Sequence, residues 1–122
     1  LFTRLVGAEH VRTDVASRAY YAQDIFYWPG ATLPEAVVAP GAVDELVAVM
    51  RAAAAAGLAV VPRGGGMSYT GGYVPHGAPA VVLDLRRLAR IREVNATDGY
   101  VLAEAGATWA ALRDALEPHG LR

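Results

Sequence analysis

A run of glycines near the middle of this 122-residue sequence is the segment best suited to chemistry. The stretch AVVPRGGGMSYTGG, residues 59–72, places five glycines within the nine positions 64–72. Glycine reaches positive φ without strain, and it lets backbone N–H groups approach a ligand because no side chain intervenes. Successive N–H groups that point into one concavity bind anions such as phosphate. The sequence therefore predicts a phosphate site, with a glycine-rich hairpin or bulge that holds no ligand as the alternative.

The spacing of the glycines excludes the two common nucleotide motifs. The Walker motif needs a lysine after its second glycine, and the sequence contains no lysine. Gly64 and Gly66 begin a Rossmann pattern, but Tyr69 stands where the third glycine is required. The glycines and prolines after the loop also argue against a helix there, so no helix dipole would hold the anion. The backbone amides of the loop itself must do so.

Polar side chains in and near the loop leave several roles open. Arg63 would pair with a phosphate or would brace the loop by donating to carbonyls, and the sequence does not decide between them. The hydroxyls of Ser68 and Thr70 would assist the amides, while Tyr69 would stack on a cofactor or simply pack. Asp84 lies at the distance of a ribose-binding acid, but the failed Rossmann pattern favours a strand-end or turn-capping aspartate.

The composition excludes other kinds of chemistry. The sequence has no cysteine, and its three histidines are scattered without the spacing of metal ligands, so no metal site is expected. The net charge of −1 offers no attraction to nucleic acid. No apolar run reaches the length of a membrane span and no targeting segment is recognisable, so a cytoplasmic location is expected. The sequence starts at leucine and stops without a tail, which suggests part of a longer chain.

The elements around the loop follow from apolar periodicity. Strands are expected at 36–40, 58–62 and 79–85, and a helix at 43–57, so that a small parallel or mixed sheet forms. The strand before the loop is expected to be buried. The apolar face of the helix is expected to comprise Val43, Leu46, Val47, Met50, Ala53 and Ala54.

A second unit follows this sheet. Two strands within 90–106 are expected to meet at a turn near Asp98–Gly99. A helix should then begin after Thr108 as its N-cap and end at Gly120. Residues 1–34, which are rich in aromatic side chains, are expected to be a structured lead-in that packs across the edge of the domain.

The stretch VVPRGGGMSYTGG resembles the phosphate-binding loop of FAD-linked oxidoreductases of the vanillyl-alcohol oxidase type, which share the PCMH-type FAD-binding fold. The resemblance extends from about residue 34 to 122, including the downstream pattern DL…I…V…G…AEAGATW…L. It implies an α+β fold in which a small β-α-β subdomain is followed by the start of a second α/β subdomain. Residues 1–34 would be the lead-in, and 35–122 an incomplete FAD-binding domain without its substrate domain.

The resemblance also implies a cofactor site. The residues that would surround the FAD phosphates and ribose are Pro62, Arg63, Gly64, Gly65, Gly66, Met67, Ser68, Thr70, Gly71 and Gly72. In some relatives a histidine at the place of Met67 is bonded to the flavin. Methionine cannot form that bond, so non-covalent FAD is expected.

The function implied is that of a flavin-dependent oxidoreductase. It would oxidise a hydroxyl-bearing small molecule, with a 2-hydroxy acid as the expected class, by hydride transfer to FAD. Its catalytic residues would lie outside these residues, and the rest of the same polypeptide would be needed to complete the site. A non-catalytic nucleotide- or phosphate-binding module is the alternative, and a structural remnant without a ligand is a third possibility.

Overall fold

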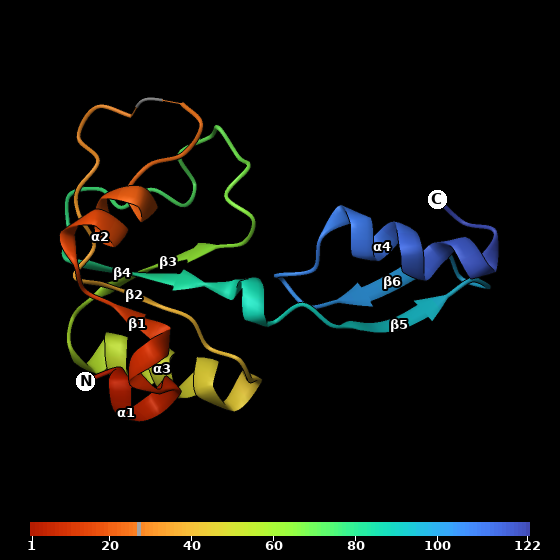
Figure 1. Ribbon diagram of the computed structural model, residues 1–122, viewed down its shortest axis with the longest axis horizontal. Helices are drawn as coiled ribbons and strands as arrows, with labels where there is room; N and C mark the ends of the chain where they lie inside the picture. The colour runs from red at the N-terminus through yellow and green to blue at the C-terminus, as the bar shows by residue number, and fades with distance from the viewer. Residues whose placement is uncertain (27) are drawn as a thin grey trace.

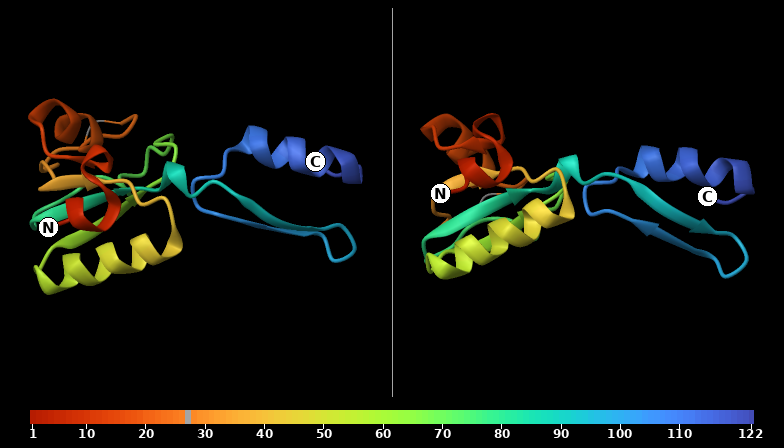
Figure 2. Two further views of the ribbon diagram at one scale, coloured as in Figure 1. Left: turned by 60° about the horizontal axis from the view of Figure 1, so that its bottom comes forward. Right: turned by 90° about the horizontal axis from the view of Figure 1, so that it is seen from below.

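The computed structural model describes residues 1–26 and 28–122, which form two lobes joined end to end (Figures 1 and 2). The larger lobe contains a four-stranded sheet with helices on both faces. The smaller lobe contains a two-stranded sheet covered on one side by a helix. This mixture of elements confirms the predicted α+β fold.

The sheet of the larger lobe has the strand order β1-β2-β4-β3. These strands are β1 (Val11–Arg12), β2 (Ala36–Val38), β4 (Ala80–Asp84) and β3 (Ala59–Arg63). β1 runs antiparallel to β2, whereas β2, β4 and β3 are mutually parallel. The sheet is therefore mixed, as predicted, and its three parallel strands end at the same edge.

The burial of the strands follows their order in the sheet. All five residues of β4, the interior strand, are buried. β3 was also expected to be buried, and this prediction was wrong because β3 is an edge strand, with Ala59 and Pro62 exposed. Its last residue, Arg63, is nevertheless buried.

Helices α1 (Thr3–Val6) and α3 (Val43–Ala55) cover one face of the sheet (Figure 1). Val49 and Ala53 of α3 are fully buried there and Leu46 packs beside them, one turn apart along the helix. The sequence predicted a different face of α3 as the buried one. Of its members Val43, Val47 and Met50 are 41 to 45% exposed, whereas Val49 was missing from it. Gly57 (φ +67°) follows the helix end as predicted.

Helix α2 (Val15–Tyr21) lies on the opposite face (Figure 1). Tyr21 packs there with Val37 and Val82, and Asp14 caps the helix by accepting a hydrogen bond from the Ser17 amide at 2.8 Å. The first 34 residues thus supply helices on both faces as well as strand β1. They are part of the larger lobe.

The smaller lobe consists of β5 (Ile91–Asn95), β6 (Tyr100–Ala103) and α4 (Trp109–Leu116), followed by the 3₁₀ turn η3 (Glu117–His119). The hairpin turn at Gly99 and the Thr108 cap of α4 are as predicted. Within the described residues no helix is long and apolar enough to cross a membrane.

A carboxylate secures the end of this hairpin. Glu104 accepts hydrogen bonds from Arg90 and Arg92 at 3.0 Å. The side-chain bond from Arg90, its backbone amide and the bond from Arg92 together lower the pKa of Glu104 to about 2, although desolvation opposes them. Glu104 is therefore ionised at neutral pH and fixes the segment that leads back to the larger lobe.

The lobes meet where Gly106 crosses the segment that leaves β4. The Gly106 amide donates to the Leu88 carbonyl at 2.7 Å. A Cβ on Gly106 would overlap the carbonyl of Leu85, in the 3₁₀ turn η2 (Leu85–Arg87), and would lie 2.8 Å from that of Leu88. Only glycine permits this approach of two backbones.

Gly106→Ala is expected to lower the free energy of unfolding by about 3 kcal/mol, because the added methyl group must push two backbone segments apart. Gly65→Ala is the matched control, since a Cβ on Gly65 meets no atom within 4 Å and φ is not positive there. Chemical denaturation measures both variants. Equal stability of the two proteins would contradict the assignment of Gly106 to a tight backbone crossing.

Candidate functional site

The glycine loop follows β3, on the side of the sheet where the carboxyl ends of the three parallel strands lie (Figure 1). No helix follows it through residue 79, in agreement with the sequence prediction. In sheets of this kind ligands bind at the carboxyl ends of the strands. The loop therefore occupies the position of a binding site, and its backbone must provide the contacts.

The first part of the loop carries a run of free amides. None of the N–H groups of residues 64–69 donates a hydrogen bond to another described residue. Gly66 has a φ of +71°, which turns the chain within this run. Backbone donors without protein partners need water or a ligand. Six such donors in succession are the strongest indication of an anion site in the described residues.

Arg63 lies directly beneath this run. Its side chain is buried, and its Nη1 donates to the carbonyl of Gln23 at 2.8 Å, with a longer contact of 3.5 Å to the Tyr21 carbonyl. Three tyrosine rings surround the guanidinium carbon at 4.7 to 5.3 Å, namely those of Tyr20, Tyr21 and Tyr73. The structure thus favours bracing through carbonyls, one of the two roles that the sequence left open.

The charge of Arg63 remains uncompensated by an ion pair. No carboxylate of the described residues lies within salt-bridge distance of it. A Cβ on Gly66 would lie 2.6 Å from Arg63 Nη2, so the loop backbone passes close to the cation. Carbonyl groups and aromatic faces stabilise a buried cation without neutralising it. Arg63 thus places a cation beside the free amides, which adds to their attraction for an anion.

The return half of the loop, which begins at Thr70, is bonded to other groups of the protein. The Thr70 amide donates to Ser68 Oγ at 3.2 Å, and the Gly71 amide donates to Asp24 Oδ2 at 2.9 Å. The two hydroxyls of Ser68 and Thr70 lie 2.9 Å apart and bond to each other. Tyr73 donates its hydroxyl to the Ser68 carbonyl at 2.6 Å. The amides of Thr70 and Gly71 are thus already satisfied, unlike those of residues 64–69.

The remaining predicted site residues lie around the free amides. Pro62 is exposed on β3, one residue before the strand ends, and Gly65 is open on its Cβ side. The Met67 side chain is 75% exposed, and that of Tyr69 is 70% exposed, so neither packs into the core of the described residues. Gly72 is exposed. The ten predicted positions thus comprise the last two residues of β3 and the loop that follows, in which the donors are divided unevenly.

A turn of the smaller lobe borders the loop. The carbonyl of Ala105 lies 3.2 Å from the position that a Cβ on Gly64 would occupy. Gly106 holds this turn against the segment that follows β4, so Gly64 is bordered by the smaller lobe as well as by its own strand. Sequence patterns did not single out Gly106 as a contact, since the crossing exists only in three dimensions.

Asp84 has the capping role that the sequence favoured. Its buried carboxylate accepts from the Arg86 amide, from Arg86 Nη2 at 2.6 Å and from the Tyr21 hydroxyl at 2.6 Å. Desolvation raises the pKa of Asp84, but the bonds from Arg86 and Tyr21 outweigh it and the pKa lies below its ordinary value. Asp84 therefore joins β4 to α2 and is not free to bind a ribose.

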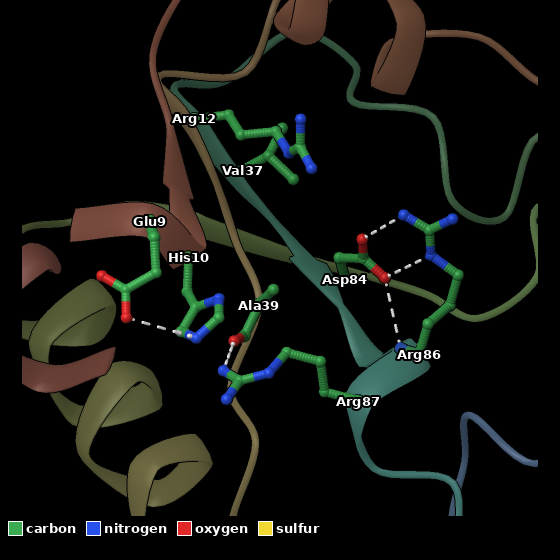
Figure 3. A pocket seen from close by; sticks show the side chains of 8 residues that line it. All are labelled: Glu9, His10, Arg12, Val37, Ala39, Asp84, Arg86 and Arg87. Carbon is green, nitrogen blue, oxygen red and sulfur yellow. Dashed lines mark hydrogen bonds and ion pairs between the residues drawn. The ribbon is translucent and has the colours of Figure 1, made fainter. Parts of the chain in front are cut away.

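A separate cavity of about 280 Å³ opens beside Asp84 (Figure 3). Arg86 is held there by Asp84, and Arg87 donates to the Ala39 carbonyl at 2.6 Å. The arginines that line it thus have structural partners, apart from Arg12, whose side chain lies over Val37. No group of three or more histidine, aspartate or glutamate side chains suited to a metal occurs in the described part of the chain.

Asp24 is the site residue that sequence reasoning missed. Its carboxylate accepts hydrogen bonds from the Gly71 and Phe26 amides and from the Trp28 indole. The only local signal was a single acid within the aromatic segment YYAQDIFYW. Its partner Gly71 lies 47 positions away in the sequence, so no periodicity could reveal the contact.

Comparisons with known proteins show the family to which the chain is related. A protein-family model described as "FAD binding domain" matches residues 34–122. The D-2-hydroxyglutarate dehydrogenase of Xanthomonas citri pv. viticola is 35% identical over 118 residues, covering 95% of this chain and 24% of that protein. The quinone-dependent D-lactate dehydrogenase of Escherichia coli is 32% identical over 121 residues, covering 96% and 21%. The chain thus spans about a quarter of the length of these relatives.

Solved structures show the same fold. The 4-ethylphenol oxidase of Gulosibacter chungangensis superposes with a TM-score of 0.83 at 28% identity, over 98% of this chain and 24% of that one. p-Cresol methylhydroxylase superposes with a TM-score of 0.75 at 20% identity, again over 98% and 24%. The predicted PCMH-type fold is thereby confirmed.

Arg63→Met is expected to lower the free energy of unfolding of the ligand-free protein by about 2 kcal/mol, since it removes the bond to Gln23 and the contacts with three tyrosine rings. Arg51→Met is the control, because Arg51 is exposed on α3 and bonds to no described side chain. Denaturant titration compares them. A loss no greater than that of the control would show that Arg63 does not brace the loop.

Proposed function

The chain belongs to the FAD binding domain family, and from that premise we propose that its full-length protein is a flavin-dependent oxidoreductase in which this chain holds the FAD diphosphate. The observation that carries the proposal is the run of free amides at residues 64–69 above the buried cation of Arg63. A diphosphate supplies the acceptor oxygens and negative charge that this arrangement lacks.

The residues fit the cofactor on steric grounds as well. Gly65 is open on the side where a side chain would stand, so a phosphate can approach the backbone. Gly64 and Gly66 admit no Cβ without displacing the Ala105 carbonyl or Arg63. Met67 carries no nucleophilic nitrogen, which supports non-covalent binding at this loop. The FAD cofactor expected from the sequence agrees with the family.

When bound, FAD accepts a hydride and passes electrons on, while the protein supplies binding and orientation. The amides of residues 64–69 would hold the diphosphate, and Arg63 would offset its charge without direct contact. The Ala105 turn would border the same site from the smaller lobe. The residues that bind the substrate and the catalytic residues would come from the remainder of the polypeptide. In the relatives, that remainder makes up three-quarters or more of the length.

The substrate that we propose is a 2-hydroxy acid. Relatives named as D-2-hydroxyglutarate and D-lactate dehydrogenases support it. A relative named alkyldihydroxyacetonephosphate synthase shows that the same domain serves other reactions.

Addition of D-lactate or D-2-hydroxyglutarate to the full-length flavoprotein without oxygen should bleach the flavin absorbance. Bleaching by a phenol but by neither acid would reject the substrate class and keep the flavin site.

Gly65→Val in the full-length protein is expected to weaken FAD binding roughly 100-fold, because the isopropyl group would occupy the space through which the phosphate reaches the amides. Thermal unfolding of the ligand-free variant should stay close to that of the natural protein, since the Cβ position is open. Flavin fluorescence titration gives both dissociation constants. An unchanged affinity of Gly65→Val for FAD would refute the role of the loop in binding the diphosphate. A natural protein that retains no flavin would favour a non-catalytic module.

A further inference from the structure

The carboxylate of Asp24 lies where the aromatic lead-in touches the return half of the glycine loop. Oδ2 accepts from the Gly71 amide at 2.9 Å and from Trp28 Nε1 at 2.9 Å, while Oδ1 accepts from the Phe26 amide at 2.7 Å. One carboxylate therefore joins the loop, an indole and the backbone of its own segment. Hydrogen bonds to an ionised acceptor are stronger than those between neutral groups.

Asp24 is ionised in this arrangement. Desolvation raises the pKa of its carboxyl, but the hydrogen bonds from Gly71, Phe26 and Trp28 and the nearby charge of Arg63 outweigh it, so the pKa lies below its ordinary value. The carboxylate can therefore accept all three bonds at neutral pH.

Gly71 is matched to this partner by its conformation. Its φ of +73° is the left-handed region that favours glycine. A Cβ there would lie 2.9 Å from Cε2 of the Trp28 ring. The Trp28 indole thus contacts Gly71 and also donates to the carboxylate that accepts the Gly71 amide. The return of the loop is held by contacts from a segment more than 40 residues earlier.

The pairing divides the loop into two functional halves. The amide of Gly71 is bonded to Asp24 and that of Thr70 to Ser68, so neither is available to a ligand without breaking a bond. The amides of residues 64–69 have no such partner among the described residues. A negative carboxylate at Gly71 also disfavours a second anion there. The amides left for an anion are those in the half of the loop nearer β3.

We propose that Asp24 is a positioning residue for the FAD loop, which fixes the return turn at Gly71 and leaves residues 64–69 as the half that binds the diphosphate. Thr70 and Gly71 then act through the shape of the loop, not through contact with the cofactor. The inference rests on the proposed function for the identity of the ligand, but the fixing of the loop does not require the ligand.

The test uses Asp24→Asn in the full-length protein, with Asp14→Asn as the matched control. Asp14 also accepts a backbone amide in the lead-in, at Ser17, but it touches no part of the loop. In the ligand-free protein, hydrogen exchange of the bonded amides of Thr70, Gly71 and Val74 should quicken at least tenfold in Asp24→Asn, with no change at β4. The dissociation constant for FAD should rise about tenfold, while Asp14→Asn stays within twofold on both measures.

A third measurement separates positioning from a general structural defect. At saturating FAD, the rate at which Asp24→Asn oxidises the 2-hydroxy acid, expressed per bound flavin, should stay within twofold of the rate of the natural protein. A loss of turnover that excess FAD does not restore would overturn the proposal, as would unchanged loop exchange or an equal effect of Asp14→Asn. If the natural protein binds no FAD, the proposed function fails, whereas the exchange measurement still reports on Asp24.

Trp28→Phe covers the case in which Asp24→Asn does not fold. It removes the indole N–H from Asp24 but keeps an aromatic ring beside Gly71. Loop exchange and the FAD dissociation constant should both rise about threefold, since one of the three bonds is lost. Values equal to those of the natural protein would overturn the proposal.

Discussion

The burial of the Arg63 guanidinium without a carboxylate partner is the constraint on which the cofactor loop depends. A buried cation must be stabilised by other means, and here carbonyl groups and three tyrosine rings supply them. Those groups come from the lead-in and from beyond the loop, so both segments must fold around the end of β3. The loop backbone can pass over the cation because residue 66 is glycine. A buried cation and free amides consequently meet at one place.

This arrangement assigns a function to the first 34 residues, which otherwise look like an accessory to the sheet. They supply Tyr20 and Tyr21 to the cation, Asp24 to the return of the loop and Trp28 to the face of Gly71. On the other side, the turn that carries Ala105 is fixed by the backbone crossing at Gly106. The free amides are therefore held in place by segments from both ends of the chain.

Local signals in the sequence were sufficient to predict most elements and the loop. Apolar runs located the three parallel strands, the turn dipeptide located the hairpin, and glycines and prolines excluded a following helix. The errors arose where tertiary context decides. β3 is apolar but lies at the edge of the sheet. The buried face of α3 includes Val49, which the predicted apolar face left out. Asp24 and Gly106 act through contacts with distant residues that no local pattern encodes.

The most direct test of the account is a crystal structure of the full-length protein with FAD. The account predicts diphosphate oxygens about 2.7–3.2 Å from several amides of residues 64–69, with Arg63 still bonded to the Gln23 carbonyl and Gly71 to Asp24. A diphosphate bound elsewhere while these amides face solvent would contradict it. So would an Arg63 side chain that leaves its tyrosine rings to contact the phosphates directly.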